Sequence, residues 1–217
     1  MKAMILAAGR GERMRPLTDT IPKPLLVVNS KPLIVHHLEK LSKLGFKEVI
    51  INIAHLGYKI TQALGNGSQW NLRIRYSNES KEGALESAGG IVKALPLLGD
   101  ETFLVVNGDV YSDYDFDVNF DLGDDLAHLI LVPNPKHNED GDFGLKDGYL
   151  LNNDKIKYTF SGIGYYSPKL FKDLNYGKSA LAPILRKAIK MDKISGELFK
   201  NMWYDIGTPK RLKDINR

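Results

Sequence analysis

The sequence predicts an α/β fold in which a mixed, mostly parallel sheet carries helices on both faces. Short apolar runs alternate with amphipathic stretches through the first half of the chain, as they do in successive βαβ units. The first of these runs, residues 2–8, is short and stops at Gly9, as a buried strand does. No linker interrupts the 217 residues, so we expect one domain whose less regular second half packs on the first.

Each predicted element follows from its local pattern. Residues 32–44 are predicted to form a helix because Pro32 suits a first turn, Gly45 suits a helix end and apolar side chains recur at helical spacing. The other elements expected before residue 110 are strands at 49–53, 72–76 and 102–106 and helices at 57–64 and 89–98. After it we expect strands at 126–132, 157–166 and 203–206 and a helix at 180–190.

Composition excludes several classes of protein. The 30 Lys and Arg residues exceed the 26 Asp and Glu residues by only four, which permits an anionic small ligand but does not indicate nucleic-acid binding. Cysteine is absent, so disulfide scaffolds, thiolate metal sites and a cysteine nucleophile are excluded. A secretory signal and a run of about 18 apolar residues are also missing. We therefore expect a cytoplasmic protein that does not associate with membranes.

The loop that follows the first predicted strand is a candidate phosphate-binding loop. Gly9 and Gly11 let the backbone approach an anion and turn its N–H groups toward it. Arg13 and Arg15 could add charge-assisted hydrogen bonds to phosphate. The Gly-Lys-Ser/Thr ending of a Walker A loop is missing, and Met14 stands where a dinucleotide fingerprint needs its third glycine. A simple turn between strand and helix is the alternative.

Three further residues are candidates for phosphate and metal chemistry. Lys23 lies between two prolines, which restrict the backbone on both sides and aim its ammonium group, although a surface lysine in a turn is the alternative. Asp109 follows a predicted central strand, where parallel sheets bind ligands, although it could instead cap the next segment. Asp205 is flanked by apolar residues and needs a partner if it is buried. We expect Asp109 and Asp205 to hold Mg²⁺, which takes one or two protein carboxylates together with phosphate oxygens and water.

Other patterns are either ambiguous or lead to exclusions. Small residues at 85–91 could admit a flat base against the backbone, or they could serve close packing. The acidic residues between 109 and 125 do not match a calcium-binding loop. Neither the His-Glu-x-x-His motif of zinc proteases nor the Gly-x-Ser-x-Gly motif of serine hydrolases is present. Zinc-dependent and serine-dependent hydrolysis therefore lack support.

Together, these segments resemble the sugar-phosphate nucleotidyltransferases. The motifs of that family occur here in order, at residues 6–16, 22–24, 86–89, 108–109 and 205. The resemblance implies a single Rossmann-like nucleotidyltransferase domain over residues 1–217. It has a nucleotide-binding half at about 1–110 and a sugar-binding half at about 111–217. It also implies that a sugar 1-phosphate and a nucleoside triphosphate react to give a nucleotide sugar and pyrophosphate, with Mg²⁺ as cofactor.

The resemblance also implies roles for individual residues. The implied catalytic residues are Arg15, Lys23 and Asp109, and the implied metal ligands are Asp109 and Asp205. The implied nucleotide-binding residues are Ala8, Gly9, Gly11, Glu12, Arg13, Lys23, Glu79, Ser87 and Gly89. The implied sugar-binding residues are Asn107, Asp142 and Gly162.

Within the family, the resemblance is greatest to short members that use UTP and N-acetylmuramate 1-phosphate in peptidoglycan recycling. The stretches that carry it are residues 85–96, 141–143, 160–163 and 203–208. Glu86 and Ser87 stand where the broader family has Gly-Thr, in the region that reads the base. The alternatives are a mannose-1-phosphate guanylyltransferase and a nucleotidyltransferase for another sugar 1-phosphate or for phosphocholine. A non-catalytic regulator that binds nucleotide sugars is the alternative of another class. The expected partners are small molecules, and we expect a monomer or a small homo-oligomer.

Overall fold

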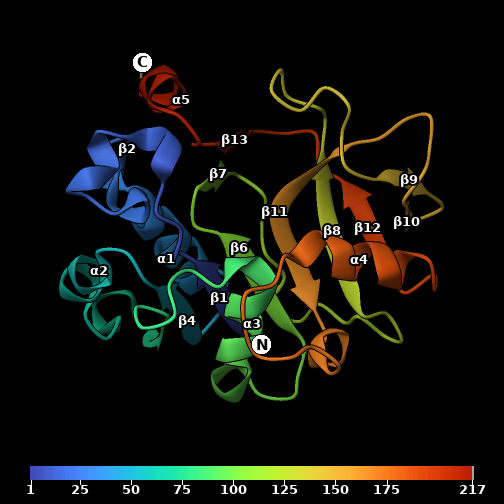
Figure 1. Ribbon diagram of the computed structural model, residues 1–217, viewed down its shortest axis with the longest axis horizontal. Helices are drawn as coiled ribbons and strands as arrows, with labels where there is room; N and C mark the ends of the chain where they lie inside the picture. Colours follow the sequence, from blue (N-terminus) through green and yellow to red (C-terminus); the bar gives the residue numbers. More distant parts are fainter. Residues whose placement is uncertain (217) are drawn as a thin grey trace.

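The centre of the protein is a large mixed sheet (Figure 1). The computed structural model describes residues 1–216. Within that range nine strands lie in the spatial order β5 (Arg73–Asn78), β4 (Glu48–Ile53), β1 (Lys2–Leu6), β6 (Phe103–Asn107), β11 (Thr159–Tyr166), β8 (Ala127–Val132), β12 (Ile194–Leu198), β10 (Tyr149–Leu151) and β9 (Gly144–Lys146). Only β11 and β10 run against the direction of the other strands. The predicted mixed, mostly parallel α/β sheet is confirmed.

Helices cover both faces of this sheet. The covering helices are α1 (Leu33–Lys43), α2 (Gly57–Leu64), α3 (Glu86–Leu98) and α4 (Leu181–Ile189). Helix α5 (Pro209–Ile215) lies beyond the sheet. Successive side chains of a strand point to opposite faces, so Ala3 and Ile5 of β1 pack under α1 and α2 while Met4 packs under α3 and α4. All three are fully buried. The apolar run at the start of the chain is therefore a strand buried on both faces.

The predicted helices at 32–44, 57–64 and 180–190 are confirmed to within one residue at each end by α1, α2 and α4. The helix expected at 89–98 begins earlier, at Glu86. Two glycines near its start weaken the local helical signal. One of them, Gly89, meets a packing need, because a Cβ atom there would lie 2.2 Å from the carbonyl oxygen of Gly177.

Strands β12, β10 and β9 form the far edge of the sheet and were not among the predicted strands. Glycine is rare within strands, so Gly196 obscures β12 in the sequence. The structure explains that glycine, because a Cβ atom there would lie 2.7 Å from the carbonyl oxygen of Leu129 and 2.3 Å from Cδ1 of Leu150. Tight packing between neighbouring strands has overridden local propensity.

Among residues 1–216, two short ribbons lie outside the large sheet. Strands β2 (Val27–Val28) and β3 (Lys31–Pro32) form one of them. The other pairs β7 (Val110–Ser112) with β13 (Trp203–Asp205) and confirms the late strand expected at 203–206. Within residues 1–216, the helices are all too short or too polar to cross a bilayer.

Candidate active site

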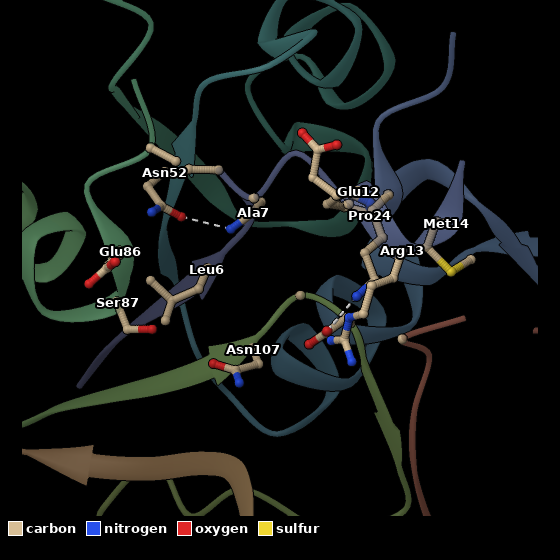
Figure 2. A pocket seen from close by; sticks show the side chains of 18 of the residues that line it. Leu6, Ala7, Glu12, Arg13, Met14, Pro24, Asn52, Glu86, Ser87 and Asn107 are labelled. Atoms are coloured by element: carbon tan, nitrogen blue, oxygen red, sulfur yellow. Dashed lines mark hydrogen bonds and ion pairs between the residues drawn. The ribbon is translucent and has the colours of Figure 1, made fainter. Parts of the chain in front are cut away.

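A pocket of about 330 Å³ opens where the parallel strands β1, β4 and β6 end. Figure 2 shows Glu86 and Ser87 on one side of it and Arg13 and Met14 on the other, with Leu6 and Asn107 between them. Ligands of parallel sheets bind at this edge. The lining consists of Leu6, Ala7, Ala8, Gly9, Gly11, Glu12, Arg13, Met14, Lys23, Pro24, Asn52, Glu79, Ala84, Glu86, Ser87, Asn107, Gly108, Asp109 and Gly207.

The loop after β1 forms one wall of the pocket. Gly11 has a φ of +66°, and a Cβ atom there would lie 2.9 Å from Cγ2 of Thr18, so only glycine fits. The Thr18 hydroxyl and the backbone N–H of Met14 both donate hydrogen bonds to the Gly11 carbonyl, over 2.9 and 2.8 Å. These bonds fold the loop into a turn whose backbone borders the pocket. Ala8, Gly9, Gly11, Glu12 and Arg13 all line it, as a phosphate-binding loop requires.

Arg15 lies outside the pocket lining. Its guanidinium Nε is 3.3 Å from a carboxylate oxygen of Glu12 and 3.2 Å from one of Asp19. The side chain is 54% exposed, so the group lies at the surface beside the loop. Its expected catalytic role stays a prediction.

Lys23 and Asp109 form an ion pair in the pocket although 86 residues separate them in the sequence. The Lys23 ammonium lies 2.5 Å from Oδ2 of Asp109. Lys23 opens a single helical turn, Lys23–Leu25, after the extended Pro22, and its side chain is only 14% exposed. The pocket therefore holds a cation and a carboxylate side by side, and a phosphate group could contact both.

The segment that carries Asp205 pairs with the segment that follows Asp109. The Asp205 side chain, however, has partners other than Lys23 and Asp109. The Ile206 N–H donates a hydrogen bond of 2.8 Å to the Asp109 carbonyl, which fixes the two segments together. One carboxylate oxygen of Asp205 binds the Arg211 guanidinium and lies 3.1 Å from Nε2 of His137. Asp205 lines a second cavity, of about 350 Å³. The rest of that lining is Val132, Pro133, Pro135, His137, Lys200, Asn201, Trp203, Tyr204 and Arg211.

Glu79 is completely buried in the pocket lining. Its carboxylate accepts hydrogen bonds from Nδ2 of Asn52, over 2.7 Å, and from the Leu85 N–H, over 2.8 Å. Burial raises the pKa of this carboxyl group above its usual value, and the two hydrogen bonds act in the opposite direction. Ser87 also lines the pocket, whereas Gly89 is buried against Gly177, outside the lining.

Asn52 is a site residue that sequence reasoning missed. It accepts a hydrogen bond of 2.7 Å from the Ala7 N–H, which Figure 2 shows as a dashed line. The available signal was a single amide within the apolar run of residues 49–53. A buried polar side chain needs partners, so one inside a central strand near its carboxyl end is a candidate site residue.

The three expected sugar-binding residues lie at different places. Asn107 lines the pocket, and Gly162 packs against it, because a Cβ atom at Gly162 would lie 2.5 Å from Nδ2 of Asn107. Asp142 lies outside the lining, and its carboxylate accepts hydrogen bonds from the Phe160 N–H and from Nδ2 of Asn138. These bonds fix the turn around Asp142. A sugar-binding role for the three residues stays a prediction.

Comparison with known sequences decides the family. The sequence model of the family described as "Nucleotidyl transferase" matches residues 2–217. The chain belongs to that family. A relative named N-acetylmuramate alpha-1-phosphate uridylyltransferase, from Neisseria meningitidis serogroup B, is 52% identical over 99% of this chain and 96% of its own length. A mannose-1-phosphate guanyltransferase from Aspergillus fumigatus is 29% identical over 97% of this chain, which spans 62% of that relative.

A solved structure agrees with the fold of this nucleotidyl transferase. It is a putative glucose-1-phosphate thymidylyltransferase from Bacillus anthracis, crystallised in complex with a sucrose. It superposes with a TM-score of 0.84 over 100% of this chain and 94% of its own, at 24% sequence identity. The likeness supports the single α/β sheet with its covering helices.

The carboxylates of this nucleotidyl transferase suit a hard cation. Among the described residues, no group of three or more His, Asp or Glu side chains is arranged to hold a metal. Mg²⁺ requires fewer protein ligands, because substrate phosphates and water complete its coordination. Asp109 and Asp205 offer oxygen donors on two paired segments, and each now has a cationic partner. Carboxylate oxygens are the donors that Mg²⁺ prefers, but Asp109 and Asp205 line different cavities, so their joint binding of the ion stays a prediction.

Proposed function

We propose that this nucleotidyl transferase joins UTP and N-acetylmuramate 1-phosphate to give UDP-N-acetylmuramate and pyrophosphate. The observation that carries the proposal is the 52% identity, over nearly the full length of both chains, to a relative named for that reaction. The pocket supports it, since the Lys23–Asp109 pair and the glycine loop lie together at the edge of the sheet where phosphates would bind.

The proposed reaction is an in-line displacement at the α-phosphorus of UTP. A phosphate oxygen of the sugar substrate forms the new P–O bond, and the bond to pyrophosphate breaks. Both reactants are anions, so alignment and charge neutralisation are the main requirements. Lys23 neutralises the sugar phosphate near the α-phosphate. Arg15 and the backbone amides around Gly9–Arg13 hold the triphosphate and the leaving pyrophosphate.

Asp109 and Asp205 are the proposed ligands of Mg²⁺. The ion supplies positive charge to the phosphate oxygens when it is bound. To hold the ion, the two carboxylates would release their present partners, Lys23 and Arg211. Lys23 then becomes available to the phosphate groups.

The remaining site residues are assigned to the two substrates. Ser87 and Gly89 belong to the nucleotide-binding set in the first turns of α3, and Glu79, which follows β5, supports that set through its hydrogen bond with the Leu85 N–H. Asn107, Asp142 and Gly162 belong to the sugar-binding set. The second cavity lies beside Asp205 and is a further candidate for part of the sugar. The expected setting, cytoplasmic peptidoglycan recycling by a monomer or small homo-oligomer, stays a prediction.

A substrate panel with pyrophosphate release as readout tests the proposal. UTP and GTP are each offered with N-acetylmuramate 1-phosphate, N-acetylglucosamine 1-phosphate, mannose 1-phosphate and phosphocholine, with and without Mg²⁺. We expect the fastest turnover with UTP and N-acetylmuramate 1-phosphate, and only when Mg²⁺ is present. Faster turnover with GTP and mannose 1-phosphate would replace the proposed substrates. No pyrophosphate from any pair would favour a non-catalytic binding protein.

A further inference from the structure

A continuous chain of hydrogen bonds crosses the pocket wall. It begins at the Ala7 N–H, which donates to Oδ1 of Asn52, and continues from Nδ2 of Asn52 to Oε1 of Glu79. It ends at Oε2 of Glu79, which accepts from the Leu85 N–H. The three bonds measure 2.7, 2.7 and 2.8 Å. The chain therefore joins the glycine loop after β1 to the start of α3.

The side chains of this hydrogen-bond chain are closely enclosed. Asn52 is 3% exposed and Glu79 is 0% exposed. Helix α3 packs directly on the bond between them, because a Cβ atom at Gly90 would lie 2.8 Å from Nδ2 of Asn52 and 2.9 Å from Oε1 of Glu79. A buried hydrogen bond is costly to leave unmade, since water cannot replace the lost partner. The enclosure therefore holds the two backbone ends at a fixed separation.

The direction of each hydrogen bond follows from the chemistry of the groups. A carboxylate at position 79 can only accept, so it requires a donor on both sides, namely the Asn52 amide and the Leu85 N–H. The amide NH₂ of Asn52 must then face Glu79, which leaves its oxygen for the Ala7 N–H. A single orientation of Asn52 satisfies all the groups. Glu79 thus determines which atom of Asn52 faces the Ala7 N–H, although Glu79 and Ala7 share no hydrogen bond.

We propose that Glu79 is a positioning residue that sets the distance between the phosphate-binding loop and the start of α3. A nucleoside triphosphate in the pocket has its phosphates at the loop and its base toward Glu86 and Ser87, so it must match that distance. Glu79 acts through Asn52 and Leu85 and makes no contact with the nucleotide. The inference rests on the proposed function, because it assumes that a nucleotide occupies this pocket.

The first test replaces Glu79 by glutamine. A glutamine offers one acceptor oxygen, so its NH₂ group must face a donor at one end of the hydrogen-bond chain. The loop and α3 then lose their fixed spacing, whereas each remains able to bind its own part of the ligand. We expect Glu79→Gln to weaken UTP binding by about tenfold, the factor expected for one lost hydrogen bond to a charged group. Binding of inorganic triphosphate, measured by calorimetry in parallel, should stay within about twofold of wild type.

The second test exchanges the two functional groups. In Asn52→Asp/Glu79→Gln, Asp at position 52 accepts from Ala7 N–H and from the new NH₂ group, and the glutamine oxygen accepts from Leu85 N–H. All donors again meet acceptors, so we expect UTP affinity to recover to within about twofold of wild type. Asn52→Asp alone places two carboxylates side by side and should bind UTP at least as weakly as Glu79→Gln.

Glu82→Gln is the matched control. Glu82 belongs to the same segment and also has two partners, Lys93 and Tyr176, but it lies outside the pocket lining. Its replacement should leave the binding of both UTP and triphosphate unchanged. If Glu79→Gln does not fold, the double variant decides alone, because it must fold and bind UTP as the wild type does.

Two results would overturn the positioning role. One is an equal loss of UTP and triphosphate binding in Glu79→Gln, which would show that the residue only keeps the loop intact. The other is a folded double variant that binds UTP no better than the single variants. Failure of the proposed function has a different signature, because wild-type protein would then turn over a nucleotide other than UTP. The same comparison with that nucleotide still tests the hydrogen-bond chain.

Discussion

At the scale of single residues, the ion pair between Lys23 and Asp109 brings a cation and a carboxylate together in the pocket. Sequence reasoning found both residues because each has a distinctive neighbourhood, two prolines around Lys23 and the end of an apolar strand before Asp109. It missed Asn52, whose importance depends on Ala7 and Glu79, residues that only the fold brings together. It also expected a catalytic role for Arg15, which stays a prediction, and here the partners of the Arg15 guanidinium are Glu12 and Asp19.

Asp109→Asn should abolish turnover while leaving the fold intact. The amide cannot neutralise Lys23, and it is a far weaker ligand for Mg²⁺ than a carboxylate. The carboxylate is 29% exposed, so its replacement should cost no more than about 1 kcal/mol of stability. Pyrophosphate release and thermal unfolding measured on one preparation test both parts. A variant with normal activity would refute the metal assignment.

Gly9→Ala should impair nucleotide binding without loss of stability. A Cβ atom at Gly9 would have no heavy atom within 4 Å, and its φ is not positive. The added methyl group instead occupies the edge of the pocket that Gly9 lines. We expect the KM for UTP to rise by about tenfold, a cost typical of a small steric obstruction, at an unchanged melting temperature. Gly11→Ala, at a strained position, should lower the melting temperature as well.

At the scale of elements, α3 shows which part of a helix can be predicted from local sequence and which part cannot. Its apolar face predicts a helix from residue 89, yet residues 86–88 were missed, because the start of α3 is held by the distant Ser179 carbonyl, which accepts from the Ala88 and Gly89 N–H groups. Gly89 and Gly90 are each explained only by a distant neighbour, the Gly177 carbonyl for one and the Asn52–Glu79 bond for the other. Local propensity therefore predicts the middle of this helix and fails where tertiary contacts decide.

Gly89→Ala should destabilise the protein through the segment that packs on α3. The new Cβ atom would lie 2.2 Å from the Gly177 carbonyl oxygen, a backbone atom that cannot move without its neighbours. The Ser179 carbonyl also accepts hydrogen bonds from the Ala88 and Gly89 N–H groups, so displacement of residues 177–179 would weaken these bonds. We expect a loss of about 2 kcal/mol or more in the free energy of unfolding. Ser87→Ala, which adds no atoms, is the control, and equal stability of the two variants would contradict the explanation.

At the scale of the whole molecule, the alternation of strands and helices was sufficient to predict the α/β class and the edge at which the pocket opens. The far edge of the sheet was not predictable, because β9 and β10 have three residues each and no strong pattern. The place of Asp205 was half predicted. Its segment does lie beside Asp109, but its side chain contacts Arg211, six residues later, and His137, 68 residues earlier, and only the fold brings His137 to it.

The stability of the molecule should fall in mild acid because of a buried histidine in α1. Burial lowers the pKa of His37 from 6.5 to about 4. Between these two pKa values, the unfolded chain binds a proton on His37 and the folded chain does not. Neutral His37 therefore contributes its full share to the free energy of unfolding above pH 6.5, and that share is lost as the pH falls toward 4. The predicted loss is about 3 kcal/mol. His37→Leu removes the titrating group, so its free energy of unfolding should decline less over this interval in urea titrations. Parallel declines in the two proteins would contradict the assignment.

The pairing of β7 with β13 has a consequence for biosynthesis. The Asp109 carbonyl receives its hydrogen bond from Ile206, whose codon lies 97 positions later. At roughly 10 residues per second, a ribosome needs about ten seconds to cover that distance. Until then the nascent chain has the glycine loop and the lysine of the pocket but lacks the segment that carries Asp205. The site should therefore be incomplete during synthesis, and catalysis should begin only after β13 has paired with β7.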